Sequence, residues 1–177
     1  MPRVYHVKSA RKKNPVADVG ESYYWWKFAF GPKRFSKTYP KRSQLTQSSF
    51  LSQLYDLEDG LDAEVQFEDC QSRLDEIVDT LNELMDECQS SLDNMPEHLQ
   101  DTSDSGITLT ERIDALESAI SDYESIEIPE EPGDWEDEIQ GYNELDKDGK
   151  SQTIEEWKEE KVNDFMQELQ ENFPIVP

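Results

Sequence analysis

Basic and aromatic residues are interspersed between positions 23 and 42 of this 177-residue chain. Lysine and arginine side chains contact phosphates, and flat aromatic rings stack on nucleotide bases. Such contacts are expected from five residues, Trp25, Lys27, Lys33, Arg34 and Lys37. This combination is typical of proteins that bind single strands or nucleic-acid hairpins. The cluster therefore predicts a surface that binds nucleic acid or another acidic partner.

The charge of the chain is divided between two segments of opposite sign. Residues 1–43 contain 11 basic and two acidic residues, which gives a net charge of +9. Residues 44–177 contain six basic and 39 acidic residues, which gives a net charge of −33. The basic segment could therefore bind the acidic remainder of its own chain or an acidic partner chain, instead of nucleic acid. Both interpretations stay open at the level of the sequence.

A second group of candidate contact residues lies in the acidic stretch 46–95. Apolar residues from Phe67 to Met95 recur at steps of three and four, which predicts one apolar stripe along an α-helix. The other faces carry mostly Asp and Glu. The residues that we expect to bind a basic partner are Asp75, Glu76, Asp79, Glu83 and Asp86.

The density of this negative charge suggests a nucleic-acid mimic. A helix over 46–95 would be about 70 Å long. If the net charge of −33 is spread along that length, there is one negative charge per ~2 Å, compared with one per ~1.7 Å in duplex DNA. A solvated surface that keeps the protein soluble is the simpler alternative.

Residues that support catalysis or metal binding are sparse. His6 and His98 lie in separate segments, and neither Cys70 nor Cys88 has a neighbouring histidine or basic cluster to activate it. No Gly-rich phosphate loop and no His/Cys metal spacing occurs. Residues 144–155 align loosely with a calcium loop, although a polar turn before a helix accounts for them more simply. We therefore expect no enzyme activity, no cofactor and no bound metal.

A small β-sheet should position the basic cluster. Residues 22–30 and 33–39 are rich in β-formers and are separated by Gly31 and Pro32, which predicts a hairpin. Residues 3–8 could add a third strand. The face that should pack on the following helix, through Phe50, Leu51 and Leu54, comprises Tyr24, Trp26, Phe28 and Phe30.

Helices should make up the rest of the chain. The long helix over 46–95 should have a local irregularity near Gly60, where the apolar repeat slips between Leu61 and Phe67. A capping-box pattern at Thr108 predicts the start of a second helix that packs antiparallel on the first. Further helical pieces are expected at 135–142 and 154–173.

These elements define a fold class and a division of the chain. We expect a mostly helical α+β protein, in which a basic β-hairpin or three-stranded sheet precedes an elongated, acidic, antiparallel coiled-coil bundle. The expected domains are a basic aromatic β domain at 1–45, an acidic helical hairpin at 46–128 and a C-terminal helical segment at 129–177.

The N-terminal segment resembles the opening of small uncharacterised proteins of tailed bacteriophages. The resemblance covers about residues 1–50 and is carried mainly by Tyr5–Lys8, Gly20–Phe28 and Lys33–Thr38. The same hairpin looks like the three-stranded DNA-binding domains at the front of phage integrases, although the catalytic residues of recombinases are missing here. The resemblance implies a phage protein acting in the bacterial cytoplasm, and small acidic phage proteins often inhibit host defence or nucleic-acid enzymes.

Two functions are therefore expected as alternatives. In the first, a non-enzymatic phage-type protein uses its acidic helical body to occupy the basic groove of a host protein. In the second, the basic hairpin binds DNA or RNA, and the acidic coil dimerises or recruits a partner. A parallel homodimer through the apolar stripe would bring Cys70 and Cys88 to their symmetry mates. The sequence has no apolar run that could span a membrane and no signal peptide, so a cytoplasmic location is expected.

Overall fold

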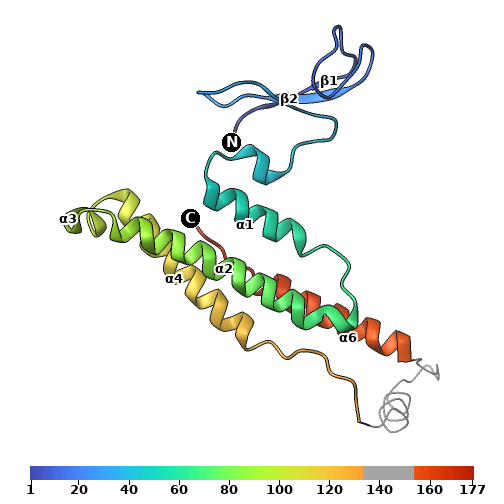
Figure 1. The fold of residues 1–177 in the computed structure, drawn as a ribbon, viewed down its shortest axis with the longest axis vertical. Helices are drawn as coiled ribbons and strands as arrows, with labels where there is room; N and C mark the ends of the chain where they lie inside the picture. The colour runs from blue at the N-terminus through green and yellow to red at the C-terminus, as the bar shows by residue number, and fades with distance from the viewer. Residues whose placement is uncertain (134–153) are drawn as a thin grey trace. The chain divides into compact units, whose positions relative to one another are not determined.

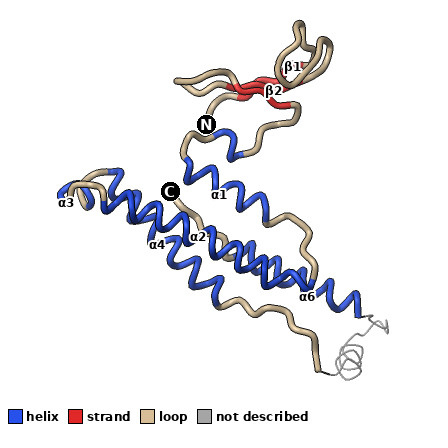
Figure 2. Tube along the Cα trace, viewed as in Figure 1, coloured by secondary structure: helices blue, strands red, loops and turns tan. Residues whose placement is uncertain are grey.

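A computed structural model describes residues 1–133 and 154–177 of the chain. These residues form two compact units, Met1–Gly60 and Leu61–Pro177. Figure 2 shows a sheet in the first unit and, among the described residues of the second, helices joined by loops. The mostly helical α+β class and the small N-terminal sheet agree with the sequence-based expectation.

Three short antiparallel strands form the sheet of the first unit, in the order β1-β2-β3. They are β1 (Val4–Val7), β2 (Tyr23–Trp26) and β3 (Arg34–Ser36). Tyr5 lies opposite Trp25, and Trp25 lies opposite Phe35. Because directly paired residues point to the same side of a sheet, these three rings share one face. The predicted hairpin is confirmed, and residues 3–8 do contribute the third strand.

The opposite face of the sheet contributes to the core of the first unit. Trp26 is 2% exposed, and its indole Nε1–H donates to the carbonyl of Gln44 at 3.2 Å. Gln44 belongs to the 3-10 helix η1 (Arg42–Leu45), which precedes α1 (Ser49–Gly60). The other buried apolar residues here include Leu45, Phe50, Leu54 and Leu57. The expectation that Phe30 joins this core was wrong. Phe30 is 90% exposed, because the chain leaves the sheet after Trp26 and turns at Gly31.

The single helix predicted over 46–95 is also wrong. The chain forms α1 up to Gly60, a non-helical stretch, the 3-10 helix η2 (Phe67–Asp69) and then α2 (Cys70–Asp93). The break falls where the apolar repeat slips. In a continuous helix, the apolar stripe that begins at Phe67 would lie on a different side from the apolar residues that precede it. Glycine is also a poor helix former. With 24 residues, α2 is about 36 Å long.

Helices α2 and α4 (Asp104–Glu124) form the predicted αα-hairpin and lie side by side in Figure 1. The stripe on α2 is buried from Cys70 to Cys88, and α4 contributes Leu116, Ile120 and Tyr123. The short α3 (Glu97–Gln100) connects them. The helix expected to start at Thr108 starts four residues earlier, because the Ser103 hydroxyl caps it by accepting the backbone N–H of Gly106.

Helix α6 (Ile154–Glu171) contacts η2 and α4 within the second unit. The Tyr123 hydroxyl donates to the carbonyl of Leu169 at 2.8 Å, and the Trp157 ring lies 6.0 Å from that of Phe67. The last helix predicted over 154–173 is present over Ile154–Glu171. The helical piece predicted at 135–142 lies outside the described residues, as does most of the 144–155 loop. Among the described helices, none has both the length and the apolar character needed to cross a membrane.

Candidate nucleic-acid interface

The outward face of the sheet carries two stacked aromatic rings with a basic side chain at each end of the stack. The guanidinium of Arg3 lies 5.2 Å from the Tyr5 ring centroid, and the Tyr5 ring stacks on Trp25 at 4.4 Å with a 10° angle between the planes. The Lys33 ammonium lies 4.2 Å from the Trp25 ring. We call these four residues the ladder surface: Arg3, Tyr5, Trp25 and Lys33.

The strand order explains this arrangement. Trp25 lies on the central strand, Tyr5 comes from β1 on one side, and Lys33 precedes β3 on the other. Both faces of the Trp25 ring are therefore covered, by a ring and by a cation. The indole is not free to stack on a base. It holds the ammonium of Lys33 in place without neutralising its charge, because a ring attracts a cation through its quadrupole.

The other predicted contact residues are spread around the sheet. Arg34 pairs with Trp26, so it belongs to the opposite face, where its guanidinium lies 5.0 Å from the Phe28 ring. Lys27 follows β2 and is exposed. Lys37 follows β3 and forms an ion pair with Glu21 at 3.2 Å. The five residues named from the sequence therefore do not form one continuous surface.

Among the five predicted contact residues, Lys37 is the one whose charge is balanced by an ion pair to a described residue, Glu21. The pKa of the Glu21 carboxyl is lowered, first by a hydrogen bond from the backbone N–H of Asp18 and then by Lys37. The Glu21 carboxylate is therefore ionised over the whole neutral range. We expect Lys37 to attract a phosphate less strongly than Lys27 or Lys33, which have no ion pair with the described residues.

The first unit as a whole keeps an excess of unpaired cations. It contains 11 basic and five acidic residues, a net charge of +6. Four ion pairs occupy four of those acids, including Lys41 with Asp59 at 3.6 Å and Arg42 with Glu58 at 2.6 Å. Part of the basic segment thus binds acidic residues of α1, as the docking alternative requires. The basic residues without an ion pair to any described residue are Arg3, Lys8, Arg11, Lys12, Lys27, Lys33 and Arg34.

The predicted acidic face lies on α2 of the second unit. All five of its residues are exposed: Asp75, Glu76, Asp79, Glu83 and Asp86. Gln71 donates to Asp75 at 2.7 Å, and Arg73 pairs with Glu76 at 2.7 Å. The other three carboxylates contact no cation or donor among the described residues. Their spacing of four and three residues places them on one side of the helix.

The helix break removes one argument for the acidic face as a nucleic-acid mimic. The charge density estimated from the sequence assumed one helix of about 70 Å, and α2 is only about half that length. The five exposed carboxylates are a local acidic surface.

The cysteines lie inside the second unit. Cys70 is 0% exposed and Cys88 is 3% exposed, and burial raises the pKa of both thiols. Raised pKa values disfavour the reactive thiolate. Within residues 1–133 and 154–177, no group of three or more metal-ligating side chains is found. The homodimer through the stripe stays a prediction, and it would require α2 and α4 to separate because they bury that stripe together.

Sequence reasoning missed Arg3 and Tyr5. The only sequence signal for them is their alternation in a β-prone segment, and their partnership with Trp25 depends on the register of β1 against β2. Comparisons with known proteins add no further candidate residue, since no family model, no curated protein and no solved structure matches the chain.

Proposed function

We propose that the unit Met1–Gly60 binds nucleic acid, with the ladder surface as its main contact. The observation that carries the proposal is the row Arg3, Tyr5, Trp25 and Lys33, in which each terminal cation rests on a ring. Long basic side chains lose conformational entropy when they bind a phosphate. A ring that already restricts them reduces this loss, so cations held in this way suit binding of a phosphate backbone.

The distribution of charge in the unit supports the same function. Most of its acidic residues are already paired, so the remaining positive charge is available to phosphates. The side chains near the ladder are basic or aromatic and make contacts to the backbone and sugars of a strand without reading sequence. We therefore expect binding that depends steeply on salt and weakly on sequence.

Charge reversal on the ladder tests this function. Each of Arg3→Glu and Lys33→Glu should weaken binding of a fluorescent oligonucleotide by about tenfold, as expected when a phosphate contact is replaced by repulsion. The matched control is Lys13→Glu, which changes the net charge equally but affects a residue paired with Asp18 at 2.9 Å. If the control weakens binding as much as the ladder variants, only overall charge matters and the ladder is not the contact surface.

A second candidate function uses the acidic face of α2. Here the supporting observation is that Asp79, Glu83 and Asp86 are exposed together, without a partner among the described residues. Such a face would bind a basic groove on another protein, as a phage-type inhibitor of a host defence or nucleic-acid enzyme in a bacterial cytoplasm would do. A captured bacterial protein should then be released by duplex DNA and lost in an Asp79→Lys/Glu83→Lys variant. Capture that is unaffected by both changes would contradict this function.

A further inference from the structure

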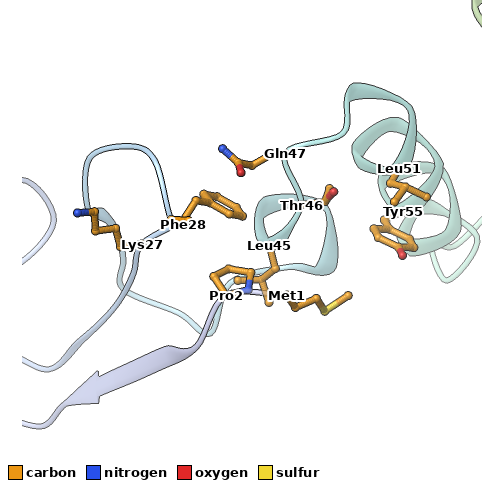
Figure 3. A pocket seen from close by; sticks show the side chains of 10 residues that line it. Met1, Pro2, Lys27, Phe28, Leu45, Thr46, Gln47, Leu51 and Tyr55 are labelled. Atoms are coloured by element: carbon orange, nitrogen blue, oxygen red, sulfur yellow. The ribbon is translucent and has the colours of Figure 1, made fainter. Parts of the chain in front are cut away.

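The first unit contains a pocket between the chain that follows β2 and the helices η1 and α1. The pocket has a volume of about 440 Å³. This volume is within the range of about 300–1,000 Å³ in which proteins bind small molecules. Figure 3 shows Phe28 on one side, Leu51 and Tyr55 on the other, and Leu45 between them. The walls are therefore a mixture of polar and apolar groups and include two aromatic rings.

Each of these two rings has an arginine over it. The guanidinium of Arg34 lies 5.0 Å from the Phe28 ring centroid, and that of Arg42 lies 4.2 Å from the Tyr55 ring centroid. A cation over one face of a ring leaves the other face for a planar group. Arg42 is also paired with Glu58, so it holds Tyr55 in place without adding net charge. The rings are thus positioned before any ligand enters.

Polar groups suited to the edge of a base lie at the rim of the same pocket. The amide of Gln47 makes no hydrogen bond with the described residues, so its donor and acceptor are both available. The Thr46 hydroxyl accepts the backbone N–H of Ser48 at 3.1 Å and keeps its own proton to donate. Lys27 also lines the pocket, and Figure 3 shows its ammonium pointing away from the interior. A phosphate next to a bound base could contact it there.

We propose that this pocket takes one unstacked base of a single-stranded nucleic acid, while Lys27 contacts a flanking phosphate. The inference rests on the proposed function and deepens it by naming the ligand class. A base within a duplex is stacked and paired, so it would have to be extruded before it could enter. Single strands present their bases without this cost, and an aromatic wall accepts any base because every base has a flat face.

The test compares two oligonucleotides that have the same phosphates. One is a fluorescein-labelled 12-mer of thymidine, and the other is a 12-mer in which every base is replaced by an abasic analogue. The full-length protein should bind the thymidine strand about tenfold more tightly, in line with the stacking contribution of a single base. Equal affinity for the two strands would contradict binding of a base in the pocket. The proposed function, nucleic-acid binding by the first unit, would still stand. Failure to bind either strand at low salt overturns the proposed function itself.

Pocket variants localise the base preference. Leu51→Trp fills the pocket and should abolish the preference for the thymidine strand, while binding of the abasic strand is kept. The matched control is Gln53→Trp, which adds the same side chain to α1 outside the pocket and should retain the preference. Tyr55→Leu removes an aromatic wall and serves as a second variant if Leu51→Trp does not fold. A preference that survives in a folded Leu51→Trp or Tyr55→Leu protein would contradict the proposal.

Discussion

The ammonium of Lys33 lies 4.2 Å from the centre of the Trp25 ring, on the side of β2 opposite to Tyr5. This relationship gives Trp25 a different role from the one that its sequence suggests. An isolated exposed tryptophan would be a stacking platform for a base. Here Tyr5 and Lys33 cover the two faces of the ring. Trp25 therefore affects ligand binding by holding the Lys33 ammonium in position.

Trp25→Ala should therefore weaken oligonucleotide binding only moderately, by about two- to fivefold, because a surface cation–π contact contributes about 0.5–1 kcal/mol. Trp25→Phe keeps a ring beneath Lys33 and should recover most of the affinity. Fluorescence anisotropy titrations of both variants, with circular dichroism to check folding, measure this. If Trp25→Phe binds the oligonucleotide as weakly as Trp25→Ala, the contact between the ring and Lys33 does not contribute to affinity.

Gly106→Ala should destabilise the second unit by about 1–3 kcal/mol, the usual range for forced overpacking. A Cβ on Gly106 would lie 2.1 Å from the backbone oxygen of Gln100, so α3 and α4 would have to shift apart. The matched control is Gly133→Ala, where an added Cβ meets nothing within 4 Å and stability should change by less than about 0.5 kcal/mol. Urea denaturation of the two variants compares them. Equal effects would mean that the close approach of α3 to α4 does not exist.

The second unit should lose stability in alkaline solution, above about pH 10. Burial raises the pKa of the Tyr123 phenol above its usual value. The unfolded phenol releases its proton near pH 10, while the folded one keeps it, so higher pH favours the unfolded state. Stability linked to Tyr123 is thus complete below the unfolded pKa and is lost as the pH rises above it.

Tyr123→Phe isolates this contribution. The variant should be less stable at neutral pH by about 1–3 kcal/mol, because the buried carbonyl of Leu169 loses its donor. Its stability should also fall less steeply than that of the wild type above pH 10. The thiols of Cys70 and Cys88 titrate in both proteins and cancel in the comparison. Parallel pH profiles for the two proteins would show that Tyr123 is not buried in its neutral form.

Both cysteines should resist thiol reagents in the folded protein. Cys70 and Cys88 are almost completely buried and have raised pKa values, so modification requires local or global opening of the helices. Modification followed across a urea series should therefore rise together with the loss of helical circular dichroism. Prompt reaction of either thiol in the absence of urea would contradict the packing of α2 against α4.

Local patterns were sufficient to predict part of this fold. The strand at Tyr23–Trp26 follows from a run of aromatic residues ended by a Gly-Pro turn, and the stripe on α2 follows from its helical spacing. The break after Gly60 was anticipated only as an irregularity. Whether a slipped repeat bends a helix or ends it depends on tertiary packing, here including the burial of Leu61.

The candidate site was less predictable than the fold, because its residues meet through long-range contacts. Trp25 and Lys33 were expected to lie on one surface, but the enclosure of Trp25 by Tyr5 depends on the register of two strands. The pocket joins Phe28 to Tyr55, which β3 and η1 separate in the sequence. No local pattern around either ring indicates that they face one cavity.

The most direct test of the central claim is the salt dependence of oligonucleotide binding by the full-length protein. Arg3, Lys27 and Lys33 are each expected to contact one phosphate of a single strand. A plot of the logarithm of the association constant against the logarithm of the salt concentration should then have a slope of about −2, since each contact contributes about −0.7. A measurable affinity at low salt that declines with this slope is the predicted result. No binding at low salt, or binding that does not change with salt, would contradict nucleic-acid recognition by the ladder surface.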